Sequence, residues 1–88
     1  MEEKLSFPAK VVYREEPGGA ILFNVDTGEM RIVEEVGWGI CAMIHNGTNR
    51  SDVLAALRKK YPDQKTVEKD MDDFLSELEE ADMLQRES

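Results

Sequence analysis

The spacing of the apolar residues changes near residue 35, and this change limits the possible folds more than any other feature of the chain. Before it lie three short segments, 10–14, 20–24 and 29–33, which are rich in β-branched and aromatic residues, as strands are. After it, apolar residues recur every three or four positions, which places them on one face of a helix. The clearest of these faces is the last, formed by Val67, Met71, Phe74, Leu75 and Leu78.

Two turn sequences join the three expected strands. Pro17-Gly18-Gly19 combines a fixed φ with residues that tolerate positive φ, and Asp26-Thr27-Gly28 offers glycine for the left-handed position of a short hairpin. Consecutive strands joined by tight turns pair antiparallel, so we expect a three-stranded antiparallel meander. Because helices follow the strands along the chain, the pattern predicts an α+β fold.

Three helices are expected after the meander. The first runs from about Val36 to about Ile44 and stops at Asn46-Gly47, a pair that takes the left-handed C-cap conformation easily. The second is capped by the hydroxyl of Ser51 and ends before Pro62, and Thr66 is the expected cap of the third. We expect Phe74 and Leu78 to be buried on the inner face of this last helix.

The length of 88 residues predicts one domain, 1–88, with frayed ends over residues 1–7 and 85–88. The chain contains no apolar run of membrane-spanning length, and its acidic first residues do not resemble a secretory signal. The single cysteine, Cys41, excludes an internal disulfide and fits a reducing cytoplasm. We therefore expect a cytoplasmic protein.

Charge argues against nucleic acid and anionic membranes as partners. The formal net charge is −8, and the last helix region, 66–82, carries eight acidic residues and one basic residue. A helix of this composition is repelled by phosphates. Residues 50–65 are instead net basic, with five basic and two acidic side chains. That surface is either a solvated helix face, which we favour, or a docking site for an acidic partner.

No set of residues indicates catalysis or metal binding. Cys41 lies on the inward stripe of the first helix, which favours a buried structural thiol over a reactive one. His45 has no Cys or His partner at ligand spacing. The sequence also lacks a nucleophile–base pair, a phosphate-binding glycine loop and a cysteine cluster. We expect no enzyme activity, no cofactor and no metal.

The third expected strand, 29–33, is either an inner strand or an exposed edge. In the simplest meander the second strand is central, so the third becomes an edge. The segment contains no proline, so its backbone N–H and C=O groups remain available to a guest strand.

The order and spacing of several motifs resemble the PqqD-like peptide chaperones, also called RiPP recognition elements. The resemblance runs from Phe7-Pro8 to Met83-Leu84. It rests on Pro8 with Arg14-Glu15, Gly19-Ala20-Ile21-Leu22-Phe23-Asn24, Asp26-Thr27-Gly28, Val33, Val36-Gly37, Ile40, Asn46-Gly47, Leu54 with Tyr61, and Asp70-Met71-x-x-Phe74-Leu75-x-x-Leu78. Glu34 departs from the family pattern, which often places a capping Asn before the first helix.

The resemblance implies a winged helix-turn-helix-like, non-catalytic chaperone. Such domains bind the leader of a ribosomally synthesised precursor peptide, which adds a strand to the third strand and lies in the groove beside the last helix. They present the peptide to a modifying enzyme, often a radical-SAM enzyme. The alternative is a winged-helix nucleic-acid-binding module or a regulatory protein-interaction module.

The candidate peptide-binding residues are two sets. The first is the edge strand, where we expect Met30 and Ile32 in the core and Arg31 on the outer face, paired with an acidic leader residue. Trp38, beyond it, either flanks the core or joins an exposed contact patch. The full first set is Glu29, Met30, Arg31, Ile32 and Val33. The second set is one flank of the last helix, Asp70, Phe74 and Glu77, with the opposite flank, Glu68, Asp72 and Glu79, as an open alternative.

Overall fold

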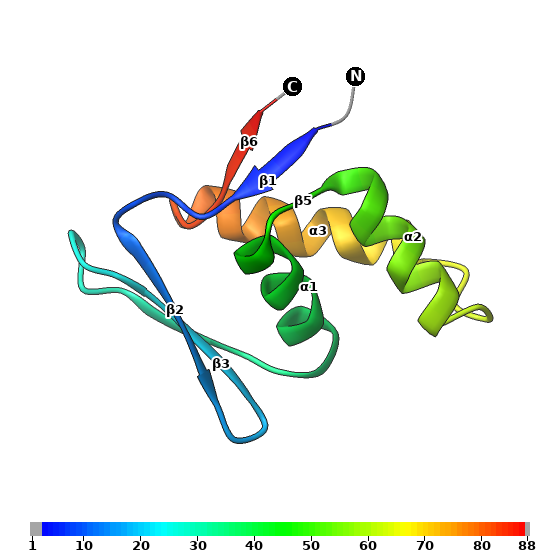
Figure 1. Cartoon of the computed structure of the whole chain (residues 1–88), viewed down its shortest axis with the longest axis horizontal. Helices are drawn as coiled ribbons and strands as arrows, with labels where there is room; N and C mark the ends of the chain where they lie inside the picture. The colour runs from blue at the N-terminus through cyan, green and yellow to red at the C-terminus, as the bar shows by residue number, and fades with distance from the viewer. Residues whose placement is uncertain (1–2, 88) are drawn as a thin grey trace.

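The computed structural model describes residues 3–87, which form strands and helices in an α+β arrangement. The prediction of this fold class is confirmed. Figure 1 shows α1 next to the β2–β3–β4 sheet, with α2 on the far side of α1 and α3 crossing behind them. The elements are β1 (Lys4–Ser6), β2 (Val11–Glu16), β3 (Gly19–Asn24), β4 (Met30–Val33), α1 (Glu35–Asn46), β5 (Thr48–Asn49), α2 (Arg50–Lys60), α3 (Val67–Glu80) and β6 (Gln85–Glu87).

The expected meander is the sheet with strand order β2-β3-β4, and both of its strand pairs are antiparallel. Gly18 (φ 86°) and Gly28 (φ 78°) occupy the positive-φ positions of its two turns. Asn24 is fully buried at the end of β3, and its Oδ1 accepts hydrogen bonds from the N–H groups of Asp26 and Thr27. This side chain shapes the second turn from inside and fixes where β4 starts.

A second small sheet, with strand order β5-β1-β6, joins the two ends of the chain. The prediction of frayed ends is therefore wrong for Lys4–Ser6 and Gln85–Glu87, while residues 1–2 and 88 lie outside the described residues. Leu5, at 2% exposure, anchors β1 in the core, and Arg86 of β6 forms an ion pair with Glu3. Burial and pairing together hold these short strands in place.

The core lies between the helices and the inner face of the meander. Leu22, Ile40, Leu75 and Leu78 are essentially inaccessible, and Cys41 is buried among them, as predicted. Trp38 is partly buried and packs against this core, so it flanks the core. No helix in the described part of the chain is long and apolar enough to cross a membrane.

The helix caps differ from the expected ones. Asn49, not Ser51, caps α2, because its side-chain oxygen accepts the N–H of Asp52 at 2.8 Å. Thr66 does occupy the N-cap position of α3, but its hydroxyl bonds the Asp70 carboxylate at 3.0 Å. Acidic residues in the first turn of α3 also favour the positive end of the helix dipole.

Candidate functional site

The outer edge of β4 is open within the described residues, because β4 pairs with β3 alone. The N–H of Asn24 donates a hydrogen bond to the carbonyl of Glu29, and this bond shows which residue pairs of β3 and β4 are hydrogen-bonded to each other. Antiparallel pairs alternate, so the backbone groups of Arg31 and Val33 face β3, whereas those of Met30 and Ile32 point away from it. These outward N–H and C=O groups are available for another strand.

The opposite edge of the sheet is less available. By the same alternation, the outward backbone groups of β2 belong to Val11, Tyr13 and Glu15. The N–H of Val11 already donates to the carbonyl of Pro8 at 2.9 Å. The ring of Tyr13 stacks between Phe7 and His45, which places the chain around residue 7 beside this strand.

The side chains of β4 face the opposite way from the prediction. Met30 and Ile32 are 59% and 68% exposed, so the expectation that they lie in the core is wrong, as is the placement of Arg31 on the outer face. The register explains this outcome, because Val33 pairs with Ala20, which faces the helices and is buried. Arg31 shares that inner face, since side chains two residues apart lie on the same side of a strand.

Arg31 connects the edge strand to the last helix. Its Nη1 lies 3.3 Å from Oε1 of Glu77, and its side chain is 32% exposed. The ion pair crosses from β4 to α3, so it brings together one residue from each of the two predicted sets. Being partly exposed, the pair is worth little in stability, but it places a cation and an anion beside the open edge.

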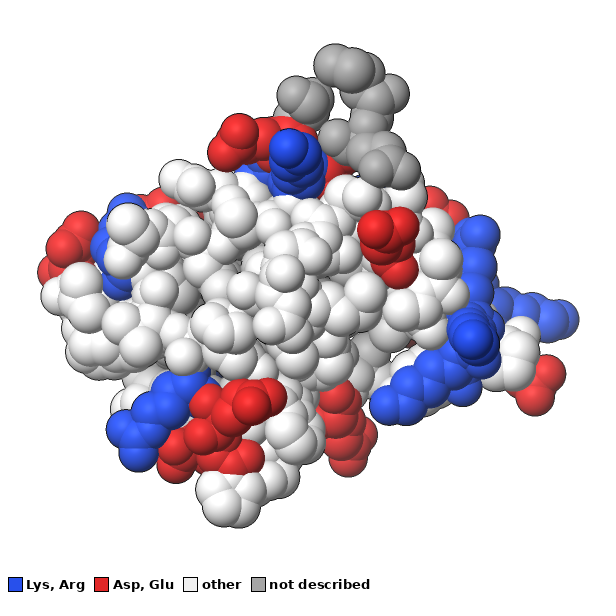
Figure 2. Space-filling model, in the orientation of Figure 1, with Lys and Arg blue, Asp and Glu red and all other residues white. Residues whose placement is uncertain are grey.

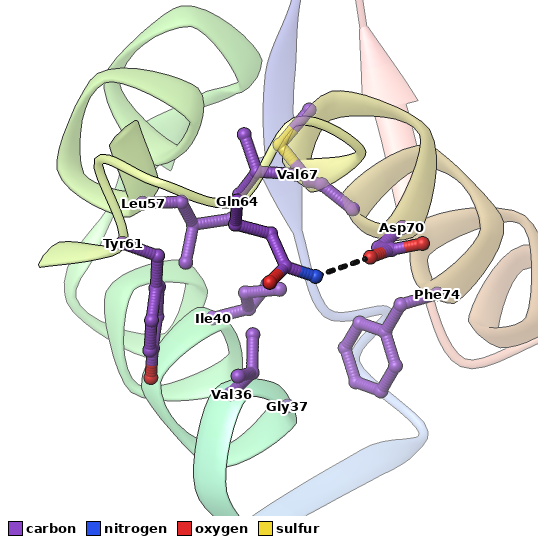
Figure 3. A pocket seen from close by; sticks show the side chains of 10 residues that line it. Val36, Gly37, Ile40, Leu57, Tyr61, Gln64, Val67, Asp70 and Phe74 are labelled. Carbon is purple, nitrogen blue, oxygen red and sulfur yellow. Dashed lines mark hydrogen bonds between the residues drawn. The ribbon is translucent and has the colours of Figure 1, made fainter. Parts of the chain in front are cut away.

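An apolar pocket of about 290 Å³ lies where α1, α2 and α3 meet, beyond the end of β4 (Figure 3). Phe74 and Asp70 of the predicted flank line it, and Asp70 accepts a hydrogen bond from Gln64 at 3.2 Å at its polar rim. Sequence reasoning missed the other lining residues, since segments far apart in the chain supply them. They are Val36, Gly37, Ile40, Leu57, Tyr61, Gln64, Val67 and Met71.

Phe74 is only partly buried, so the prediction that it is a core residue is wrong, whereas Leu78 is fully buried as expected. The Phe74 ring packs on Gly37: a Cβ at Gly37 would lie 3.1 Å from the ring. The glycine therefore permits close contact between α1 and α3. A glycine inside an expected helix was the available signal for this contact.

The opposite flank of α3 is occupied by ion pairs. Arg50 donates to both carboxylate oxygens of Asp72, at 2.9 and 2.6 Å, and to Glu68 at 2.8 Å. These hydrogen bonds hold the pKa of Asp72 below its usual value. Glu79 lies 3.4 Å from Arg86. The flank with Asp70, Phe74 and Glu77 is thus the one that borders β4 and the pocket.

The basic surface on α2 is partly neutralised from within the chain, since Arg50 and Arg58 both pair with acids of α3. Figure 2 shows one group of Lys and Arg side chains at the right, over the end of α2, and others at the left and top, while the middle of the face in view is largely uncharged. Lys60 lies over the Tyr61 ring, 5.7 Å from its centre.

Residues 3–87 contain no metal-binding cluster, and the Cys41 thiol is not activated. No group of three or more His, Cys, Asp or Glu side chains in this range is placed to hold a metal ion. Burial raises the pKa of the Cys41 thiol to about 12, so the thiolate is disfavoured. His45 stacks on Tyr13 with 4.7 Å between ring centres. The chemistry that this region offers is backbone pairing beside an apolar pocket.

Comparisons with known proteins identify a family and a similar solved structure. No curated protein matches the chain. Among solved structures, it is similar to TbiB1 in complex with the TbiA(beta) leader peptide, with 25% identity, a TM-score of 0.84, and coverage of 91% of this chain and 94% of that one. Residues 19–84 match the model of the family described as coenzyme PQQ synthesis protein D (PqqD). Since this match spans well over half of the sequence, the chain belongs to the PqqD family.

Proposed function

We propose that the chain is a non-catalytic chaperone that captures the leader segment of a ribosomally synthesised precursor peptide and presents it to a peptide-modifying enzyme. The observation that carries this proposal is the open edge of β4, with the backbone groups of Met30 and Ile32 pointing outward. Membership of the PqqD family and the similarity to TbiB1 with its bound leader peptide support it.

The leader adds a fourth strand to the β2–β3–β4 sheet. Main-chain hydrogen bonds to Met30 and Ile32 supply affinity that does not depend on the leader's sequence. Side chains of the guest strand alternate between the two faces of the sheet. Half of them lie beside the exposed side chains of Met30 and Ile32, and the other half point toward Arg31 and α3.

The leader side chains that point toward the helices determine selectivity. An acidic leader residue on this side shares the guanidinium of Arg31 with Glu77, which is 62% exposed and free to move aside. An apolar leader residue enters the pocket beside Phe74, whose lining is mostly apolar. The proposed binding set is therefore the strand Glu29, Met30, Arg31, Ile32 and Val33, with Asp70, Phe74 and Glu77 on α3.

The enzyme that receives the leader is, in this proposal, a radical-SAM enzyme of the cytoplasm. DNA binding is the weaker alternative. It would require α3 to approach phosphates, yet α3 carries Glu68, Asp70 and further acids along its length.

A pair of substitutions at one position tests strand addition. Ile32→Pro removes an N–H that points away from β3, so the sheet keeps its own pairing while the guest strand loses a donor. Ile32→Ala, the matched control, shortens the same side chain and keeps the N–H. Binding is measured by anisotropy of a labelled peptide that carries the leader of a candidate precursor from the same organism.

We expect Ile32→Pro to weaken leader binding about tenfold, the equivalent of one or two hydrogen bonds, and Ile32→Ala to weaken it by less than about threefold. Thermal melts of both variants check that the sheet stays folded. Equal affinities for the two folded variants would show that the leader does not pair with β4.

A further inference from the structure

The outer face of the meander is apolar and uncovered among the described residues. Residues 3–87 contain six exposed large apolar side chains. Four of the six project from this face, namely Val12, Phe23, Met30 and Ile32. Ile21 lies half-buried at its centre. An exposed apolar patch of this kind on a small protein commonly marks an interaction site.

The register arranges this face in three rows across the strands. Val12, Phe23 and Met30 form an apolar row, and Arg14, Ile21 and Ile32 form a mixed row. Glu16, Gly19 and Glu34 form the third, acidic row. We refer to these nine residues as the outer sheet face.

Two hollows follow these rows. One, of about 240 Å³, is lined by the apolar row together with Arg14 and Ile21. The other, of about 260 Å³, lies at the acidic end between Glu16 and Glu34. Gly19 forms part of its lining, and a Cβ there would lie 2.5 Å from the Val33 carbonyl, so no side chain fills this hollow from β3. Arg14 Nε lies 2.7 Å from Oε2 of Glu16, so Glu16 is already paired within the face. The face therefore offers an apolar seat and, beside it, an anionic one whose charge comes mainly from Glu34.

Resting on the proposed function, we propose that the outer sheet face docks the modifying enzyme through apolar side chains next to a lysine or arginine. The apolar group occupies the first hollow, and the cation lies beside Glu34 in the second, where it shares the Glu16 carboxylate with Arg14. Charge supports this occupant, because the chain carries a net charge of −8 and the acidic row attracts a basic surface.

A second copy of the chain fits this face poorly. Consider a two-fold symmetric dimer in which the outer sheet faces of two copies stack on each other. If the axis runs parallel to the strands, the acidic row of one copy lies on the acidic row of the other. An axis across the strands lays the acidic row on the apolar one. Both arrangements bury the Glu34 carboxylate while Arg14 is paired with Glu16, which is costly, and they add to the repulsion between two chains of charge −8.

The outer sheet face is continuous with the proposed leader site. A strand added to β4 extends this face, because its outward side chains lie next to Met30 and Ile32. An enzyme docked here touches the chaperone and half of the leader side chains together. It therefore binds the loaded chaperone more tightly than the empty one, which would direct the enzyme to chaperones that carry a peptide.

The test uses a purified candidate enzyme, a radical-SAM peptide-modifying enzyme from the same organism, titrated against the chain with and without a leader peptide. Val12→Lys places a cation in the apolar row on β2, on the strand farthest from the β4 edge. Glu16→Lys replaces one of the two carboxylates of the acidic row with a cation, which makes the row neutral and removes the ion pair with Arg14. Lys59→Glu on α2 is the control for a charge change away from this face. Thermal melts verify the fold of each variant, and sedimentation gives its mass.

We expect Val12→Lys and Glu16→Lys each to weaken enzyme binding about tenfold or more, and Lys59→Glu to leave it within about twofold. Leader affinity should stay within about twofold in all three. Unchanged enzyme affinity in folded Val12→Lys would overturn the proposal. The proposal would also be overturned if the wild type is a dimer and Val12→Lys makes it a monomer, because a second copy of the chain would then occupy this face. A chain that binds the enzyme through this face but never binds the leader would refute the proposed function alone.

Discussion

At the scale of single residues, the contact between Gly37 and Phe74 decides the shape of the pocket. The ring lies close enough to α1 that a side chain at residue 37 would push against it. Glycine inside a helix costs about 1 kcal/mol relative to alanine, so its presence here trades helix stability for this close approach. The partly buried ring then remains available as one wall of the pocket.

The thiol of Cys41 gives a residue-scale prediction about pH. Burial raises its pKa to about 12 in the folded chain, against the ordinary value of 9.0 that the unfolded chain shows. Its contribution to stability is therefore complete below about pH 9 and is lost as the pH rises toward 12, with a slope of at most about 1.4 kcal/mol per pH unit. Urea denaturation of wild type and Cys41→Ala between pH 8 and 11 measures this. Parallel pH dependences would contradict the account.

At the scale of elements, Arg50 joins the first turn of α2 to α3. Its guanidinium binds Asp72 with two hydrogen bonds and Glu68 with a third, and its backbone N–H donates to the Glu3 carbonyl. The side chain is 27% exposed, so solvent screens the pairs only in part. This residue therefore secures the packing of both helices against the sheet that contains β1.

We expect Arg50→Ala to lower the free energy of unfolding by about 1–2 kcal/mol at pH 7, as is usual for charge-assisted hydrogen bonds that remain partly exposed. Arg50 also lowers the pKa of Asp72, so this stabilisation is present above the unfolded pKa near 3.8 and is lost as the pH falls through the folded value. The variant should accordingly show a shallower loss of stability in acid, measured by urea denaturation at pH 7 and pH 3. Wild-type behaviour at both pH values would mean that the pairs do not stabilise the fold.

How far the sequence predicts each element depends on whether the element is specified locally. The turns at Gly18 and Gly28 and the stripe on α3 carry their own signals, and all of them are present in the structure. The strands β1 and β6 have three residues each and exist through pairing across nearly the whole chain, so no local pattern marks them. The pocket likewise needs α1, α2 and α3 to be packed before it exists.

The direction in which the β4 side chains point is hard to predict from the sequence for a different reason. Apolar residues stand at 30, 32 and 33, so either alternation fits so short a strand. Pairing with the buried residue Ala20 selects Val33 and therefore Arg31 as the inner residues. The apolar pattern predicts the edge strand but with its faces inverted, and only the register with β3 resolves this ambiguity.

At the scale of the whole molecule, charge distinguishes peptide binding from DNA binding. The net charge of −8 and the acidic α3 predict that duplex DNA does not bind at physiological salt, where even basic domains bind nonspecifically only at about 10⁻⁴–10⁻⁶ M. Anisotropy of a labelled random-sequence duplex, titrated with up to about 100 μM protein, checks this. Tight binding that weakens steeply with added salt would favour the winged-helix nucleic-acid module instead.

The most direct measurement of strand addition to β4 is amide hydrogen exchange of the chain with and without its leader peptide. The N–H groups of Met30 and Ile32 point away from β3, whereas those of Arg31 and Val33 point toward it. We expect Arg31 and Val33 to be protected in both states, and Met30 and Ile32 to become protected only when the leader is bound; a leader N-methylated along the pairing segment should bind much more weakly and give no such protection. If protection instead appears along residues 50–61, or Met30 and Ile32 stay exchangeable in the complex, the leader binds elsewhere and the account is wrong.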